Sequence, residues 1–367
     1  MVKKHGLTLM VLLFLTGCAE TKIIDDLALI NGVAYDKSDD DEKPLQATVT
    51  FPLITRDGKY DRKTLTVNSI SSKSSRGELD YLTDLQLESG QVRIALFGEE
   101  LAKEGIINIL DTLNRDPSIG SRVMLGVGKG KAGDLLKVEI ETEGQNATYL
   151  ERFVERLHKI SNEIHFDIFH FNRDYFDDGI DPILPVFNTK KHSIVYEGIG
   201  VFHKDRFIQV LNSEQSTILQ FLKERINRGT LNLKLGETDG QLDVIMLTYI
   251  ETSHKVDITS TAPERKAATI SITINGSVLE YTGKEDLSDP EIQKVMEKRI
   301  SEDLTKRSDD LINLLQEHQT DSIGIGRFVR NKMTYKDWKA LDWHKEFANM
   351  DIQVKAEVKI NNIGKWK

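Results

Sequence analysis

The chain has 367 residues, of which 39% are hydrophobic and 29% are charged, and its formal net charge is −9. This balance is typical of a water-exposed protein of two or three domains. The acidic net charge argues against sequence-independent binding of nucleic acid, which relies on clustered lysine and arginine. Cys18 is the only cysteine, so an intrachain disulfide and a cysteine-rich metal site are excluded.

The N-terminus has the layout of an export signal. Lys3 and Lys4 precede an apolar stretch at residues 7–15, which is too short to span a bilayer as a helix. The sequence Leu15-Thr16-Gly17-Cys18 then resembles the lipobox of a bacterial lipoprotein, with small residues before a cysteine. A plain secretory signal with an incidental cysteine is the alternative. We expect residues 1–17 to be removed, and Cys18 to carry S-diacylglycerol and an N-palmitoyl group as the membrane anchor.

A short polar tether is predicted at residues 18–26, followed by an N-terminal α+β domain at 27–190 that could divide into two subdomains. Apolar and alternating segments predict strands at 27–35, 45–53, 63–70, 92–97 and 122–127. The serine-rich segment 69–75 is expected to be an exposed loop, and helical spacing predicts helices at 79–87, 101–113 and 147–162. Because no βαβ rhythm is evident, we predict mixed or antiparallel sheets flanked by helices.

The main domain boundary is placed at residues 188–192, just after Asp181-Pro182-Ile183-Leu184-Pro185, and a C-terminal α+β domain is predicted at 193–367. It should begin with a β-hairpin of strands 193–202 and 206–211, turning at Lys204-Asp205. The remaining predictions are a helix at 213–227 with Ser213 as N-cap, strands at 242–250 and 269–275, and a long helix opening at Asp289-Pro290. The alternation at 352–360 predicts a strand with one buried face, as in an antiparallel sheet.

Three patterns invite a chemical interpretation, but none fits a known motif. Gly126–Lys131 follows a strand, yet it lacks the spacing of a phosphate loop or a dinucleotide fingerprint, so we expect a flexible loop. His158, His165 and His170 lack the spacing of a helical zinc motif, so ordinary histidines are expected. The acid pairs are expected to be solvated charge: Asp25-Asp26, Asp177-Asp178 and Asp309-Asp310. No nucleophile elbow is present, so no catalysis, cofactor or metal is predicted.

Three aromatic residues near the C-terminus are Trp338, Trp343 and Phe347. Trp343 and Phe347 are four apart on a predicted helix and therefore share a face. Core packing against the final strand is the favoured interpretation. A partner-binding patch is the alternative, because tryptophan is enriched at interface hot spots.

The order of several segments carries a family resemblance. The lipobox is followed by Ile24–Asp36 (IDDLALINGVAYD), later by Gly198–Phe202 (GIGVF) with its hairpin and 212–214 (NSE), and finally by Gly324, the aromatic residues above and the closing segment 361–364 (NNIG). This set resembles the Ger(x)C family, the C subunits of spore germinant receptors in spore-forming Gram-positive bacteria. The family often has Trp-Asp after the lipidated cysteine, whereas Ala19-Glu20 stands here, which bears on contacts of the tether and not on the fold.

The resemblance implies a three-domain α+β lipoprotein on the outer surface of the spore inner membrane. It implies assembly with a polytopic A subunit and a transporter-like B subunit into a receptor that responds to nutrients, and it leaves room for contacts with other germination lipoproteins. Cys18 is the one residue of this chain to which the resemblance assigns a function. The main alternative is an extracytoplasmic solute-binding lipoprotein, which predicts a deep cleft between two similar lobes. A surface hydrolase, the third hypothesis, predicts polar residues clustered in a pocket.

Overall fold

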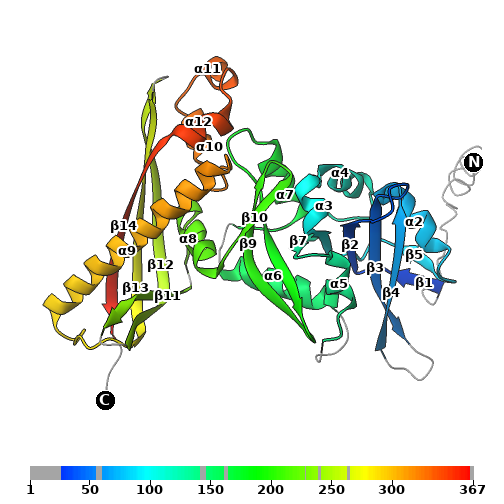
Figure 1. The fold of residues 1–367 in the computed structure, drawn as a ribbon, viewed down its shortest axis with the longest axis horizontal. Helices are drawn as coiled ribbons and strands as arrows, with labels where there is room; N and C mark the ends of the chain where they lie inside the picture. The colour runs from blue at the N-terminus through cyan, green and yellow to red at the C-terminus, as the bar shows by residue number, and fades with distance from the viewer. Residues whose placement is uncertain are drawn as a thin grey trace, which may run out of the picture.

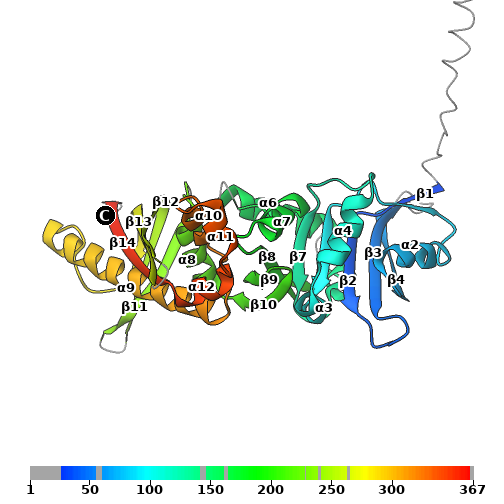
Figure 2. The ribbon, with the colours of Figure 1, turned by 90° about the horizontal axis from the view of Figure 1, so that it is seen from above.

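The computed structural model describes residues 26–54, 60–140, 146–160, 164–227, 229–238, 241–262 and 265–363. The predicted signal peptide, Cys18, the tether up to residue 25 and Gly364 lie outside these residues. The described chain is elongated, with two main sheets and their helices arranged along its longest axis (Figures 1 and 2). The predicted α+β fold with mixed sheets is confirmed.

The larger sheet has eight strands in the order β10-β9-β8-β7-β6-β2-β3-β4. In chain order they are β2 (Gly32–Lys37), β3 (Leu45–Ile54), β4 (Tyr60–Ser69), β6 (Ile94–Gly98), β7 (Met124–Gly128), β8 (Ile183–Lys190), β9 (Ser193–His203) and β10 (Arg206–Leu211). The four central strands β2, β6, β7 and β8 are parallel, and the outer strands are antiparallel. This parallel centre was not predicted, because its crossovers are not single helices: the first contains strands as well as one helix, and the other two contain two and three helices.

Helices of the first half connect these strands. They are α2 (Ser72–Asp80), α3 (Glu99–Glu104), α4 (Ile107–Arg115), α5 (Ala132–Lys137), α6 (Asn146–Ile160) and α7 (Ile168–Phe176). The loop predicted at 69–75 is wrong, since Ser71 and Ser74 form a capping box that starts α2. The helix predicted at 79–87 is also wrong, because α2 ends at Asp80 and Leu87 lies in β5 (Gln86–Glu88), paired with β1 (Leu27–Leu29). The predicted helix 101–113 is interrupted at Gly105, and the predicted strand 27–35 divides into β1 and β2.

The predicted domain boundary falls in the turn between β8 and β9. These strands pair antiparallel from Ile183 opposite Val201 to Lys190 opposite Ser193. The hairpin of β9 and β10 was predicted correctly, and Lys204 turns with φ of +56°. The eight-stranded sheet therefore contains residues from both sides of the predicted boundary.

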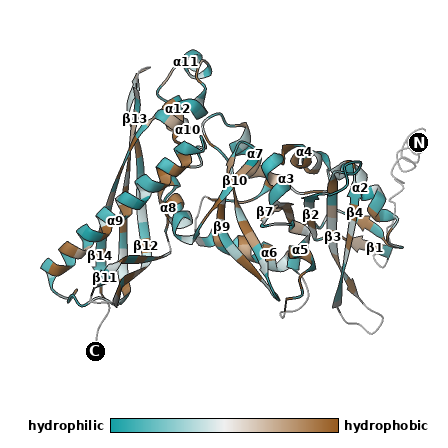
Figure 3. Cartoon of the chain, viewed as in Figure 1, coloured by the Kyte–Doolittle hydropathy of each residue, from teal (hydrophilic) through white to brown (hydrophobic). Residues whose placement is uncertain are grey.

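The smaller sheet has the order β11-β12-β13-β14, with strands β11 (Thr230–Thr238), β12 (Gln241–Ala262), β13 (Arg265–Tyr281) and β14 (Asp351–Asn362). Its helices are α8 (Ser213–Lys223), α9 (Pro290–Glu317), α10 (Ile325–Arg330), α11 (Tyr335–Lys339) and α12 (Trp343–Asn349). Asp289 caps α9 as predicted, whereas Asn212 and not Ser213 caps α8, through a capping box with Gln215. Hydrophobic and hydrophilic bands alternate along α9, as expected of an amphipathic helix (Figure 3).

The final strand, β14, alternates between buried and exposed side chains as predicted, but it pairs parallel with β13. The long connection through α9–α12 is what returns the chain in the same direction. Side chains of α9 accept hydrogen bonds from the free edge of β14: Thr305 from Ala356 N (3.3 Å), Ser301 from Val358 N (2.9 Å) and Glu297 from Ile360 N (2.8 Å). Four residues of a helix rise about 6 Å, which is close to the rise of two residues of a strand. Residues four apart on α9 can therefore meet residues two apart on β14, and the helix covers this edge of the sheet.

Candidate functional site at the junction of the two sheets

Two buried aspartates connect the large sheet to the segment that follows α9. Asp181 precedes β8 and Asp321 follows α9, and both are almost fully buried. The backbone N–H of Asp181 donates to the carbonyl of Asp321 (2.9 Å), and the backbone N–H of Asp321 donates to the Asp181 carboxylate (2.7 Å). We call Asp181, Asp321, Trp343 and His344 the junction latch.

The Asp321 carboxylate is the centre of this latch. It accepts four hydrogen bonds, from the backbone N–H groups of Gly324 (2.7 Å), Ile325 (3.0 Å) and Gly326 (2.7 Å) and from Nε1 of Trp343 (3.0 Å). Burial raises the pKa of Asp321, and the backbone donors oppose that rise. Gly326 is needed for the close approach of the indole, because a Cβ there would lie 2.5 Å from Trp343 Nε1.

The three aromatic residues singled out in the sequence belong to α11 and α12 and pack together. Trp338, Trp343 and Phe347 are 4%, 5% and 0% exposed. The rings of Trp338 and Trp343 are 5.4 Å apart, and those of Trp343 and Phe347 are 6.1 Å apart. Their burial favours the packing interpretation over an exposed partner-binding patch. Trp343 in addition supplies a hydrogen-bond donor to the latch.

His344 closes the other side of the latch. Its Nε2 lies 3.1 Å from both carboxylate oxygens of Asp181, which also accepts the backbone N–H of Lys204 at 2.8 Å. The ring of His203 lies 4.2 Å from that of His344, with its Nδ1 2.8 Å from the carbonyl of Gln319. Burial lowers the pKa of His344, but the hydrogen bond to Asp181 and its negative charge outweigh burial, so the pKa is raised.

A pH dependence of stability follows from His344. Because its pKa is raised on folding, its stabilising contribution is complete below the unfolded value of about 6.5 and is lost as the pH rises through the folded value. We expect His344→Gln to lower the free energy of unfolding more at pH 5.5 than at pH 8.5, as measured by urea denaturation. The control is His192→Gln, which removes an exposed histidine and should follow the wild type at both pH values. A loss that is equal at both pH values, or larger at pH 8.5, would refute this role.

Ion pairs reinforce the same junction. Arg330 of α10 binds the Asp177 carboxylate through two nitrogens, at 2.7 and 3.0 Å, and Lys339 of α11 contacts Asp178 at 2.5 Å. The expectation that Asp177-Asp178 is solvated charge is therefore wrong for Asp177, whereas Asp178 is exposed as expected. Asp310 is exposed as expected, Asp309 is half-buried with a backbone hydrogen bond to Val354 in β14, and Asp25 lies outside the described residues.

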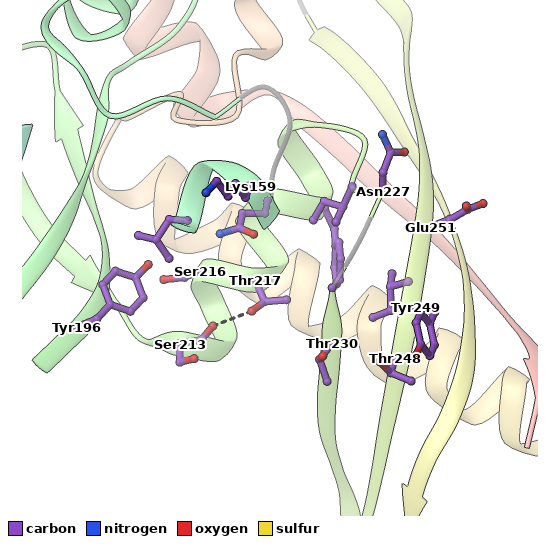
Figure 4. A pocket seen from close by; sticks show the side chains of 16 residues that line it. Lys159, Tyr196, Ser213, Ser216, Thr217, Asn227, Thr230, Thr248, Tyr249 and Glu251 are labelled. Carbon is purple, nitrogen blue, oxygen red and sulfur yellow. Dashed lines mark hydrogen bonds between the residues drawn. The ribbon is translucent and has the colours of Figure 1, made fainter. Parts of the chain in front are cut away.

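An open crevice of about 840 Å³ lies next to the junction, between the end of α6, β9, α8 and the start of the smaller sheet (Figure 4). Tyr196 and Ser216 lie on one side, and Thr248, Tyr249 and Glu251 lie on the other. Tyr249 is 81% exposed and has φ of +51°, at an irregularity in the pairing of β12 with β13. The described lining consists mainly of hydroxyl, amide and aromatic side chains and includes no histidine, aspartate or cysteine.

The glycine-rich segment Gly126–Lys131 is not the flexible loop that was expected. Its first three residues complete β7, and α5 begins directly after Lys131. The N–H groups of Ala132 and Gly133 donate to the buried Asp36 carboxylate, at 2.6 and 2.9 Å. The protein's own carboxylate thus occupies the position in which a phosphate loop would bind its ligand.

Two of the three histidines considered in the sequence come together. The potential ligand atoms of His165, Asp167 and His170 lie within 4.8 Å of one another, whereas His158 lies in α6. Asp167 Oδ1 already accepts both the backbone N–H of His170 (2.9 Å), as the N-cap of α7, and a contact from its Nδ1 (2.7 Å). These three residues could ligate a metal, but the geometry is accounted for by helix capping.

Sequence reasoning missed Asp181, Asp321 and His344. A signal existed only for Asp321, because an aspartate followed by Gly324 is typical of a turn or helix start. The partners of Asp181 within the latch, Asp321 and His344, are 140 and 163 residues away in sequence, and no local pattern predicts them. No described helix has the length and apolar content that crossing a membrane requires.

Comparisons with known proteins find similarity to spore germination proteins over nearly the whole chain. Residues 20–189 match the model of the spore germination protein N-terminal domain, and residues 197–364 match that of the spore germination B3/GerAC-like C-terminal domain. Spore germination protein GerQC of Bacillus cereus is 26% identical over 99% of both chains, and spore germination protein KC of Bacillus subtilis (strain 168) is 24% identical over 99% of this chain and 97% of its own. The crystal structure of the GerBC protein has a similar fold, with a TM-score of 0.57 and 19% identity over 90% of this chain and 97% of that chain.

Proposed function

Since the chain belongs to the Ger(x)C family of spore germination proteins, we propose that it is the lipid-anchored C subunit of a nutrient germinant receptor. The observation that carries the proposal is the presence of both family domains in series, over residues 20–189 and 197–364, directly behind a lipobox. In this proposal the chain does no catalysis. Its role is to help assemble the receptor and to take part in the signalling that starts germination.

The proposed location is the outer surface of the spore inner membrane, with lipid on Cys18 as the anchor. The lipobox and the polar tether support this location, and so does the acidic, water-exposed body that follows them. The proposed partners are the polytopic A subunit and the transporter-like B subunit. The junction latch would hold the two sheets in one orientation, so that surfaces on both can meet these partners together.

Co-purification tests the proposed partners. A tagged chain is isolated in mild detergent from spore inner membranes, and the co-purifying proteins are identified by mass spectrometry. We expect polytopic A-type and B-type proteins to be enriched over a control with an equally tagged, unrelated lipoprotein. Recovery of a membrane-bound, folded chain without either partner would contradict the proposal.

One observation favours the alternative of a solute-binding lipoprotein, namely the polar crevice of about 840 Å³ in Figure 4. The two sheets beside it have eight and four strands and do not form similar lobes. Titration calorimetry of the mature chain with amino acids and sugars separates the two functions. Saturable binding that Tyr249→Ala abolishes would favour the solute-binding function.

A further inference from the structure

Cationic side chains converge in a second crevice, of about 500 Å³, where α7, the end of α8, β12 and α10 meet. Its described lining includes Arg173, Lys223, Arg225 and Arg327 against a single acidic side chain, Glu224. The whole chain has a net charge of −9, so this local excess of positive charge runs against the general composition. Like charges held together repel one another, and a bound anion would relieve that repulsion.

Lys223 is the most deeply buried of these cations. Its Nζ donates to the carbonyl of Ser322 at 2.8 Å, at the base of the junction. Burial lowers the pKa of Lys223 and nearby Arg327 lowers it further, while Asp174 and Asp321 act in the opposite direction. These acids are already engaged, Asp174 by Arg173 at 2.7 Å and Asp321 by its four donors.

Arg327 supplies the most specific observation. Its Nε is buried and has no hydrogen-bond partner among the described residues. The guanidinium lies over Gly324, where a Cβ would come within 2.8 Å of both Nε and Nη2. Buried donors are normally satisfied, so an unpaired guanidinium nitrogen at a cationic crevice indicates a missing acceptor.

We propose that this crevice binds a phosphate group, held by Arg327 and Arg225 above the buried ammonium of Lys223. Guanidinium groups match the oxygens of phosphate, and Asn331, the C-cap of α10, adds an amide to the lining. The group could belong to a soluble phosphate compound or to an anionic lipid headgroup. The site lies apart from the crevice of Figure 4 and does not depend on the proposed receptor role.

Titration calorimetry tests the site on the mature lipidated chain in non-ionic detergent. The two ligands are inorganic pyrophosphate and soluble dihexanoyl phosphatidylglycerol. We expect at least one to bind, with an affinity that falls as salt increases, and binding of one and not the other identifies the source of the phosphate group. Arg225→Gln and Arg327→Gln should each weaken binding about tenfold or more, since each removes a charge-assisted contact.

The matched control is Arg115→Gln, which removes an exposed arginine of α4 outside the crevice. It should bind like the wild type. Arg225 is exposed, so its variant should keep the wild-type melting temperature even if Arg327→Gln does not fold. No binding of either ligand at millimolar concentration, or equal affinity in Arg225→Gln and Arg115→Gln, would overturn the proposal.

Discussion

Replacing Asp321 with alanine is expected to lower the free energy of unfolding by about 4 kcal/mol, because four buried donors would lose their acceptor at about 1–3 kcal/mol each, with some relaxation. The donors are the indole N–H of Trp343 and three consecutive backbone N–H groups from Gly324 to Gly326. The loss should also loosen α10 and α12 from the turn after α9, since the Asp321 carboxylate is what joins the start of α10 to Trp343 of α12. The two hydrogen bonds between Asp321 and Asp181 use backbone atoms of Asp321 and remain in this variant.

Urea denaturation of the mature chain measures this effect. Asp310→Ala is the matched control, since Asp310 is an exposed aspartate of α9, and it should change the free energy of unfolding by less than about 0.5 kcal/mol. Asp321→Asn should lose less than Asp321→Ala, because one oxygen acceptor remains. Equal stability of Asp321→Ala and Asp310→Ala would show that the latch does not hold the junction.

Replacing Cys18 with alanine is expected to release the chain from the membrane and to abolish germination through its receptor. Each buried CH₂ of an acyl chain contributes about 0.8 kcal/mol to membrane binding, and two chains are needed for stable attachment. No described helix could substitute as a membrane span. Fractionation of spore membranes and the loss of optical density after nutrient addition measure the two effects.

An uncleaved apolar stretch at 7–15 could itself hold the Cys18→Ala chain at the membrane. A second variant therefore replaces residues 1–18 with a secretory signal that is cleaved directly before Ala19. A control adds a transmembrane helix to this second variant and should restore membrane location. Full germination by a chain that stays soluble would contradict the proposed role of the anchor.

Local periodicity was enough to predict α9, the β9–β10 hairpin and the alternating faces of β14. Each of these depends on residues that are close in sequence. Periodicity could not give the direction of β14, because a strand with one buried face looks the same in a parallel and an antiparallel edge position.

The contacts of the junction could not be predicted from the sequence either, because their partners are far apart along the chain. Asp177 meets Arg330 across 153 residues, and Asp181 meets His344 across 163. An aspartate that forms a buried hydrogen-bonded pair is indistinguishable in sequence from a solvated one. Trp343 was noticed as an aromatic residue, but its donation to Asp321 depends on the close approach that Gly326 allows.

The anchor is tested most directly by the mass of the N-terminal tryptic peptide, Cys18–Lys22, from chain purified from spore membranes. We predict that the peptide begins at Cys18 and carries diacylglycerol on sulfur and an acyl group on its amine. A free thiol at residue 18, or a peptide in which residue 18 is still joined to Gly17, would contradict the account.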